Sequence, residues 1–246
     1  MGSFFVIASS CVFNNYIDKD IDKIMQRTCN RPFALGNINY KIAFLYGFIL
    51  GIAGFWLLIF FVNFLAFFLA FLGFFIYVFL YTLVLKRKSY LSTLVGSLSG
   101  AIPPLLGFVA VKKSLSIFSL LLFLVLFFWQ LPHFYSFALL KIEDYRKACI
   151  PMLPVVKGFE ITKHHIFFFT LCLFLVNLLG YFFLPMTYFF LIVSLILNSF
   201  FLYLSLKGYF VKNIQKWSRE TFLYSLVYLI ILLSSFIIDK ILYLYF

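Results

Sequence analysis

Charged residues are scarce in this chain. Only 11% of its 246 residues are Asp, Glu, Lys or Arg, whereas 65% are hydrophobic, and the mean hydropathy is +1.08. A soluble domain is about half apolar and about a quarter charged, so a soluble globular fold is excluded. The four cysteines form no CxxC pair and have no other metal-like spacing. They therefore indicate neither a disulfide framework nor a cysteine-based metal centre.

Acidic residues are the scarcer of the two charged classes. Eight Asp and Glu stand against 20 Lys and Arg, which gives a net charge of +12. The basic residues lie in short loops between apolar runs, where they orient helices and meet anionic lipid headgroups. No RNA- or DNA-binding module is visible, so the expected partner of this positive charge is the lipid bilayer and not a nucleic acid.

Long apolar runs dominate what is present. A bilayer core needs about 20 apolar residues per helix. Seven runs in the sequence approach this length. A further, shorter apolar stretch, Met1–Phe13, leads past Asn15 into a polar segment. It lacks the basic leader and cleavage site of a secretory signal, so we count it as an eighth membrane helix. No linker separates domains, and unpaired backbone cannot face lipid. The sequence predicts an all-α, polytopic bundle of eight transmembrane helices in one domain, residues 1–246, with the seven longer runs at 41–62, 64–85, 91–111, 115–140, 164–184, 186–206 and 220–238.

Loop charges predict the orientation of this bundle. One side carries 17 of the 20 basic residues, in segments 16–41, 86–88, 141–163 and 207–219. Such an excess is typical of the cytoplasmic side. The same side holds seven of the eight acidic residues and both long loops, 16–40 and 141–163. The functional residues are therefore expected in these cytoplasmic loops.

The first polar cluster follows the apolar N-terminal stretch. Asn14, Asp18 and Asp22 are spaced four apart, which places them on nearly one face of a helix, while Asp20 points roughly the other way. Carboxylates on one face repel each other unless a cation lies between them. Mg²⁺ is commonly held by one or two carboxylates together with phosphate oxygens and waters. The pattern favours a metal site, although charge runs of this kind are often only solvated helix ends.

Cationic side chains come directly after these carboxylates. Lys23, Arg27 and Arg31 follow in the same loop, and arginine binds phosphate oxygens through two parallel hydrogen bonds. Lys86 belongs to the cluster Lys86–Lys88 on the same predicted side. That cluster serves mainly as a topology signal, but one of its members can also contact a diphosphate.

A second polar cluster ends the run 115–140. It begins with Trp129-Gln130-Leu131-Pro132-His133, and His133 is the only histidine inside an apolar run. Ionisable groups at membrane depth are expensive and are functional candidates, although a buried, satisfied histidine is the plain alternative. Asp144 adds another carboxylate on the same side. The apolar segment 150–158, with two prolines, is interpreted either as an interfacial cap or as a lid over the site.

Together these motifs resemble a known family. The segment Asn14–Asp22 is similar to the first Asp-rich motif, NDxxDxxxD, of the UbiA superfamily of intramembrane prenyltransferases. Asn15 stands where the second-position Asp is usual. This replacement, with Arg27-Thr28-x-x-Arg31-Pro32 and the segments Trp129–His133 and Pro151–Gly158, resembles the protohaem IX farnesyltransferase (haem O synthase) branch. The likeness extends from Met1 to beyond 220–238. Family members have nine transmembrane helices, and the first is expected to be missing here.

The resemblance implies a reaction, a location and roles for the residues. The implied activity is Mg²⁺-dependent transfer of farnesyl from farnesyl diphosphate to a vinyl group of haem b, in a bacterial inner membrane. Its implied partners are other membrane proteins of haem synthesis or oxidase assembly. Metal binding and catalysis would fall to Asn14, Asp18, Asp22 and Asp144, diphosphate binding to Lys23, Arg27, Arg31 and Lys86, and haem binding to His133 and Trp129.

Two other functions stay open at this point. A prenyltransferase for an aromatic quinone precursor would carry a second Asp-rich motif where Trp129–His133 and Asp144 stand. A transporter, or a non-catalytic membrane subunit, belongs to a different class of protein. A transporter should place charges near the bilayer midplane on paired broken helices, whereas the ionisable groups here gather at one predicted face.

Overall fold

A computed structural model describes residues 1–245, and every regular element in this range is helical. The chain forms two compact units. The first contains Met1–Leu115 and Ile142–Val156, and the second contains Ser116–Lys141 and the chain from Lys157 onward. The all-α, polytopic architecture predicted from the apolar runs is confirmed.

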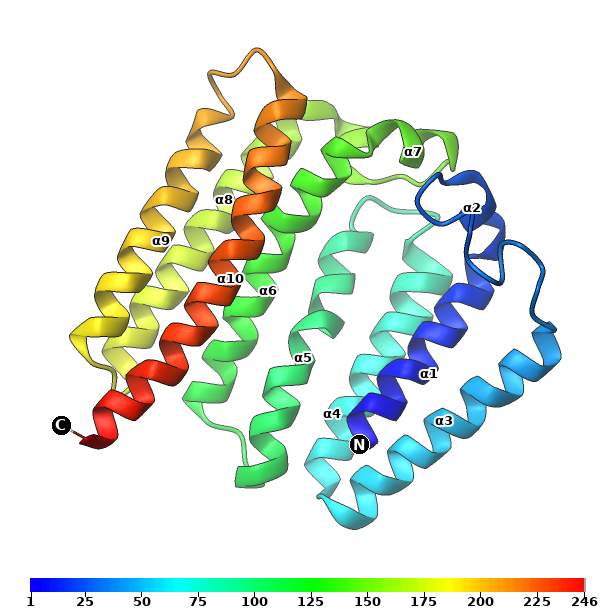
Figure 1. The fold of residues 1–246 in the computed structure, drawn as a ribbon, viewed down its shortest axis with the longest axis horizontal. Helices are drawn as coiled ribbons and strands as arrows, with labels where there is room; N and C mark the ends of the chain where they lie inside the picture. Colours follow the sequence, from blue (N-terminus) through cyan, green and yellow to red (C-terminus); the bar gives the residue numbers. More distant parts are fainter. Residues whose placement is uncertain (246) are drawn as a thin grey trace. The chain divides into compact units, whose positions relative to one another are not determined.

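Six α-helices and one π-helical segment belong to the first unit (Figure 1). The π-helical segment continues α4 without a break, and its wider turn is visible where the Lys86 N–H donates to the Tyr81 carbonyl, five residues back, at 2.8 Å. The elements are α1 (Gly2–Ile17), α2 (Lys19–Ile24), α3 (Tyr40–Phe61), α4 (Phe64–Phe75), η1 (Ile76–Leu85), α5 (Ser92–Lys112) and α7 (Ile142–Lys147).

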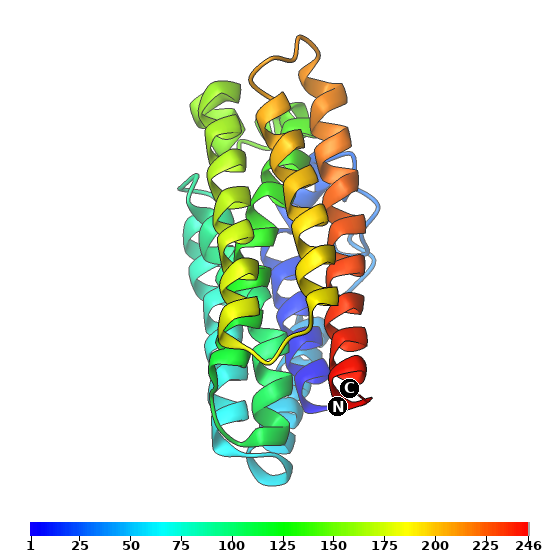
Figure 2. The same cartoon turned by 90° about the vertical axis from the view of Figure 1, so that its left-hand side faces the viewer.

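Long helices make up the second unit: α6 (Ile117–Leu140), most of α8 (Leu153–Phe183), α9 (Tyr188–Lys207) and α10 (Ile214–Tyr245). Figure 2 shows α8, α9 and α10 side by side. Buried hydrogen bonds join these three helices. The Asn177 amide of α8 donates to the Tyr228 hydroxyl of α10 at 3.0 Å, and that hydroxyl donates to the Asn198 amide oxygen of α9 at 2.9 Å. Buried apolar side chains, Phe190, Phe201 and Leu232 among them, surround this chain of polar groups.

Side chains of Asn, Ser and Thr cap the first turns of four long helices. Asn39 caps α3 and Asn63 caps α4, each by accepting a backbone N–H of the first turn. Ser116 and Ser119 form a reciprocal capping box at the start of α6, and Thr187 caps α9. These caps satisfy N–H groups that a helix leaves without a partner. They place the helix starts within a few residues of the predicted ones.

Glycines line the surface that α3 presents to α1. The buried positions of α3 include Gly47, Gly51 and Gly54, and the Ser9 hydroxyl of α1 donates to the Gly47 carbonyl at 2.7 Å. Small residues at this spacing let two backbones approach closely, which is a common way for helices to pack in a membrane. The opposite face of α3 exposes large side chains, including Phe48 and Trp56, as a lipid-facing surface does.

Seven of the described helices are long and apolar enough to cross a bilayer. They correspond to the seven long runs of the sequence. The predicted count of eight is not confirmed, because α1 has only 16 residues. The predicted loop 141–163 is wrong in part: α7 forms within it, and α8 already begins at Leu153. Gly158, with φ 74°, interrupts that helix in a backbone conformation that glycine adopts without strain.

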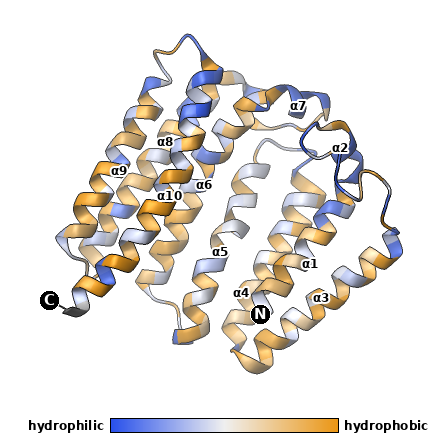
Figure 3. Ribbon diagram, viewed as in Figure 1, coloured by the Kyte–Doolittle hydropathy of each residue, from blue (hydrophilic) through white to orange (hydrophobic). Residues whose placement is uncertain are grey.

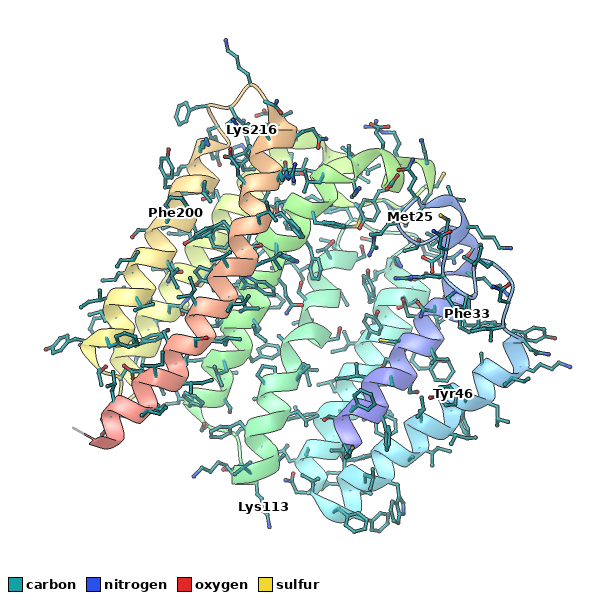
Figure 4. All side chains as sticks on the ribbon, in the orientation of Figure 1. Met25, Phe33, Tyr46, Lys113, Phe200 and Lys216 are labelled. Atoms are coloured by element: carbon teal, nitrogen blue, oxygen red, sulfur yellow. The ribbon has the colours of Figure 1, made fainter. Side chains whose placement is uncertain are left out.

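Polar residues of the first unit gather at one end of its helices. Figure 3 shows hydrophilic colour concentrated at α2 and α7, whereas α1, α3 and α4 are mostly hydrophobic. In Figure 4, Met25, which follows α2, lies at the opposite end of this unit from Lys113, which follows α5. The Asp-containing segment and the Lys112–Lys113 pair therefore lie at opposite ends of the first unit. This arrangement agrees with the predicted division of the charged segments between two sides, and which side is cytoplasmic stays a prediction.

We expect Gly54→Ala to destabilise the first unit. An added Cβ would lie 2.8 Å from the Gly2 carbonyl oxygen and 2.8 Å from the Val6 nitrogen, so α1 and α3 would have to separate. Overpacking of this kind costs about 1–3 kcal/mol. Thermal unfolding of the detergent-solubilised protein should show a clear loss. Gly107→Ala is the matched control, because nothing lies within 4 Å of its added Cβ; an equal loss in both variants would contradict the packing argument.

Candidate active site

The site is built around a break between two helices. α1 ends at Ile17, and α2 begins at Lys19. Asp18, with φ −90° and ψ 4°, is the non-helical residue between them. Its side chain is fully buried although it lies at a polar end of the unit. The break decides where the carboxylates of Asp18 and Asp22 point.

The Asp18 carboxylate has two partners on one of its oxygens and none on the other. Oδ2 accepts from the Lys86 ammonium and from the Asn14 amide nitrogen, the latter at 2.8 Å. Oδ1 is buried and has no hydrogen-bond partner among the described residues. Burial raises the pKa of Asp18, and the positive charge of Lys86 acts in the opposite direction. A buried carboxylate oxygen without a partner is costly unless a ligand satisfies it.

Asn14 is held by a residue that the sequence did not single out. Its amide nitrogen also donates to the Thr82 hydroxyl at 3.1 Å, and that hydroxyl donates to the Tyr77 carbonyl, five residues back, at 2.8 Å. Asn14 thus turns its amide nitrogen toward Asp18, whereas its predicted role as a metal ligand would use the amide oxygen. Little in the sequence identifies Thr82 as a partner of Asn14. The π-helical turn that directs Thr82 and Lys86 toward α1 follows no simple sequence periodicity.

Asp22 lies on α2 and is also buried. The Arg31 guanidinium donates to Asp22 Oδ2 at 2.9 Å and to the Asn15 amide oxygen at 3.0 Å. The Asn15 that replaces a carboxylate in the motif therefore helps to hold the arginine. The structure brings together Asn14, Asp18, Asp22, Arg31 and Lys86, five of the candidate site residues.

Asp20 faces away from this cluster, as its position on the helix predicted. It forms two hydrogen bonds with the Arg87 guanidinium, both at 2.7 Å, and a third guanidinium bond, at 2.8 Å, reaches the Ile17 carbonyl. The hydrogen bond from Arg87 is the main reason that the pKa of Asp20 falls to about 2. The pair is partly solvent-exposed.

α7 brings a further carboxylate and a tyrosine to the first unit. Asp144 is buried. Burial raises the pKa of the neighbouring Tyr145, while the positive charges of Arg27 and Lys86 lower it. Tyr145 thus lies within the electrostatic field of two predicted diphosphate-binding residues. Among residues 1–245, no ion pair or hydrogen bond joins Asp144 or Lys23 to the Asp18 cluster, and Lys23 is exposed.

The oxygen atoms of this cluster fit a magnesium ion that is bound by the protein on one side and by a diphosphate on the other. No group of three or more His, Cys, Asp or Glu side chains in the described part of the chain could enclose a metal by itself. Mg²⁺ does not require one, since it usually takes one or two carboxylates and completes its shell with waters and phosphate oxygens. The unpartnered Oδ1 of Asp18 is a free ligand of the right kind. Lys86 and Arg31 supply positive charge for phosphate oxygens at the same place.

The predicted haem-binding residues belong to the second unit. The His133 ring lies between Trp129 and Phe222, with ring centroids 4.9 and 4.8 Å away. Its Nδ1 is 2.8 Å from the Ser225 hydroxyl, and the Trp129 indole donates to the Ser225 carbonyl at 2.8 Å. Phe222 and Ser225 were not predicted. Phe222 packs against the imidazole plane, and Ser225 holds Nδ1.

The fold and this cluster define a multi-pass helical membrane protein with an acidic, metal-compatible site at one end of its helices. Residues 1–227 match the UbiA prenyltransferase family. The chain belongs to this family and is a prenyltransferase. Membership confirms the predicted enzyme class over a transporter or a non-catalytic subunit.

Curated relatives are similar over most of the chain. The Protoheme IX farnesyltransferase of Bacillus licheniformis is 44% identical over 238 residues, covering 96% of this chain and 76% of the relative. The protein of the same name from Yersinia pseudotuberculosis is 42% identical over 231 residues, covering 92% of this chain and 77% of the relative.

Solved structures agree on the fold. A structure of digeranylgeranylglyceryl phosphate synthase aligns with a TM-score of 0.83 at 22% identity, covering 96% of this chain and 82% of the other. A UbiA homologue from Archaeoglobus fulgidus, bound to DMAPP and Mg²⁺, aligns with a TM-score of 0.62 at 15% identity, covering 94% and 85%.

We expect Thr82→Val to loosen the Asn14–Asp18 arrangement. The substitution keeps the side-chain shape but removes the hydroxyl that accepts from Asn14, and a buried polar group left without its partner costs about 1–3 kcal/mol. Prenyl-transfer activity and the thermal midpoint should both fall. Thr82→Ser, which keeps the hydroxyl, should retain most of both; a serine variant as impaired as the valine variant would show that the methyl group matters instead.

Proposed function

We propose that this protein transfers the farnesyl group of farnesyl diphosphate to a vinyl group of haem b, giving haem O and diphosphate. The observation that carries the proposal is the identity of 44% and 42% to two relatives named Protoheme IX farnesyltransferase, over more than nine-tenths of this chain. The Asp18 cluster supplies the chemistry that this reaction needs.

The donor substrate is proposed to bind at the Asp18 cluster. Asp18 and Asp22 would hold Mg²⁺, assisted by Asn14, and Asp144 would contribute a further carboxylate. Bound Mg²⁺ supplies positive charge to the diphosphate that leaves. The strongest support for this assignment is the buried Oδ1 of Asp18, which has no hydrogen-bond partner among the described residues.

Lysine and arginine side chains of the protein would bind the leaving diphosphate together with Mg²⁺. Lys86 and Arg31 already lie against the carboxylates, within hydrogen-bond or ion-pair distance. They would donate to diphosphate oxygens as the allylic C–O bond breaks, and negative charge that develops on those oxygens is stabilised by donors held in place beforehand. Arg27 and Lys23 are proposed as outer contacts, with Arg27 favoured because its positive charge acts on Tyr145.

The acceptor is proposed to be oriented by the aromatic cluster of the second unit. His133, with Nδ1 held by Ser225, presents Nε2 either as an axial ligand of haem iron or as a hydrogen-bond partner. Trp129 stacks on His133 and adds flat apolar surface. A planar, largely apolar macrocycle suits such surroundings.

The whole chain is proposed to act as one prenyltransferase domain in a bacterial inner membrane. The family match runs through residues of both compact units, which favours a single functional domain. Basic loops at 16–40 and 141–163 favour a cytoplasmic location for the diphosphate site. Water-soluble phosphates would be released on that side. Association with other membrane proteins of haem synthesis or oxidase assembly is part of this proposal.

We expect membranes carrying the chain to form haem O from haem b, farnesyl diphosphate and Mg²⁺, and EDTA to abolish the product. Asp18→Asn, which keeps the shape of the side chain, and Asp18→Ala should each lower the rate by about 100-fold or more, because transition-state charge loses its support. Chromatography of extracted haems measures the product. Glu143→Gln, an exposed carboxylate of the same unit paired with Arg146, is the control.

The assay also separates this proposal from its main alternative. Wild-type protein that leaves haem b unchanged but prenylates an aromatic quinone precursor would refute the haem assignment. Normal turnover by Asp18→Asn would refute the metal assignment instead.

We expect His133→Ala to affect the acceptor more than the donor. Loss of the imidazole should raise the KM for haem b several-fold, since it removes the ring stacked between Trp129 and Phe222, and leave the KM for farnesyl diphosphate close to the wild-type value. Steady-state kinetics with each substrate varied in turn gives both constants. The control is His164→Ala, whose imidazole is exposed and contacts Tyr209. Equal changes in both KM values would contradict the assignment.

A further inference from the structure

Arg87 forms hydrogen bonds on both sides of the helix break that carries the first motif carboxylate. One guanidinium nitrogen donates to the Ile17 carbonyl, at the last residue of α1, at 2.8 Å. The same nitrogen and its twin donate to the two carboxylate oxygens of Asp20, in the first turn of α2, each at 2.7 Å. Asp18 lies between these two anchor points. A planar guanidinium forms two parallel bonds to a carboxylate and keeps further donors for the carbonyl, a geometry that an ammonium does not match.

The geometry points to a positioning role for the Arg87–Asp20 pair: we propose that it fixes the angle between α1 and α2 and thereby holds Asp18 and Asp22 in the arrangement that binds Mg²⁺ and diphosphate. The inference rests on the proposed function of the Asp18 cluster. Neither Arg87 nor Asp20 contacts the Asp18 or Asp22 carboxylate in the described contacts. The pair holds the backbone that carries these residues, and the positive charge of Arg87 also acts on Asp18 through space.

Two features separate this role from general stabilisation. The side chains of Arg87 and Asp20 are 38% and 60% exposed, and exposed ion pairs contribute little to global stability. Small displacements of groups that hold a substrate, by contrast, have large effects on rate. Cutting the pair should therefore impair the site and leave the fold nearly unchanged.

Lys86 adds a second connection between the same two segments. It is adjacent to Arg87. Lys86 forms an ion pair with the buried Asp18, whereas Arg87 forms one with the exposed Asp20. Lys86 and Arg87, which directly follow η1, thus both bind to the α1–α2 junction. Lys86 is expected to contact the diphosphate and would then loosen its ion pair with Asp18. Arg87 would stay bonded to Asp20 and the Ile17 carbonyl and keep the junction in place.

The test uses the full-length protein in detergent and compares Arg87→Ala, Arg87→Lys, Asp20→Asn and the charge swap D20R/R87D. Hydrogen–deuterium exchange of peptides covering residues 14–24 reports the junction directly, without turnover. Mg²⁺-dependent binding of a farnesyl thiodiphosphate analogue, measured by calorimetry, reports the site. The thermal midpoint reports the fold. Glu220→Gln is the matched control, because it cuts a similarly exposed ion pair, with Lys207, in the second unit.

The proposal expects faster exchange over residues 14–24 and affinity for the analogue lowered by about tenfold in Arg87→Ala and Asp20→Asn, with midpoints near the wild-type value. Adding Asp20→Asn to Arg87→Ala should change little further, because removing Arg87 already removes its bonds to Asp20. Arg87→Lys should recover only part, and so should the charge swap, which restores the ion pair but not the bond to the Ile17 carbonyl. Glu220→Gln should match the wild type in all three measurements.

Three results would overturn it. Unchanged exchange and binding in Arg87→Ala would show that the junction holds without the pair. Weaker binding in Arg87→Ala with normal binding in Asp20→Asn would mean that Arg87 contacts the diphosphate itself. A large fall in midpoint shared by every variant, charge swap included, would indicate a purely structural pair. Failure of the proposed function is separate: wild-type protein that binds the analogue without forming haem O loses the acceptor assignment and leaves this inference standing.

Discussion

The ion pair between Asp18 and Lys86 is the interaction around which the first unit's functional end is organised. A buried carboxylate and a partly buried ammonium each lose hydration, and such a pair persists only where its geometry and further hydrogen bonds are good. Here Asn14 adds a donor to the same carboxylate oxygen, and Thr82 holds Asn14. The other Asp18 oxygen has no partner among residues 1–245. The site is therefore incomplete by itself, as a site that receives a cation and a phosphate group should be.

Local irregularities in otherwise regular helices create this arrangement. The helix break at Asp18 and the π-helical turn of η1 face each other within the first unit, and the pairs Asp18–Lys86 and Asp20–Arg87 join them. π-helical turns and helix breaks are often found at functional sites, because they redirect side chains that a regular helix would send elsewhere. The neighbouring glycine-lined contact of α1 with α3 is regular and close, which gives the break a rigid support.

The two units carry chemically different parts of the proposed reaction. Charged groups for a diphosphate and a metal belong to the first unit, whereas the stacked His133 and Trp129 belong to the second. In the second unit, Asn177, Tyr228 and Asn198 form a buried hydrogen-bond network that joins three helices. Such networks hold membrane helices together where no hydrophobic driving force acts between them.

The sequence by itself determined the helical class, seven of the spans, the orientation signal and most of the candidate site residues. Apolar run length, loop charge and motif spacing are local properties, so they can be read without coordinates. Only the tertiary structure decided that Thr82 holds Asn14, that Ser225 holds His133, and that Arg87 grips Asp20. Each of these contacts joins residues more than 60 positions apart. Such contacts depend on how helices pack and where their turns deviate from regular geometry, and neither leaves a periodic signal in the sequence.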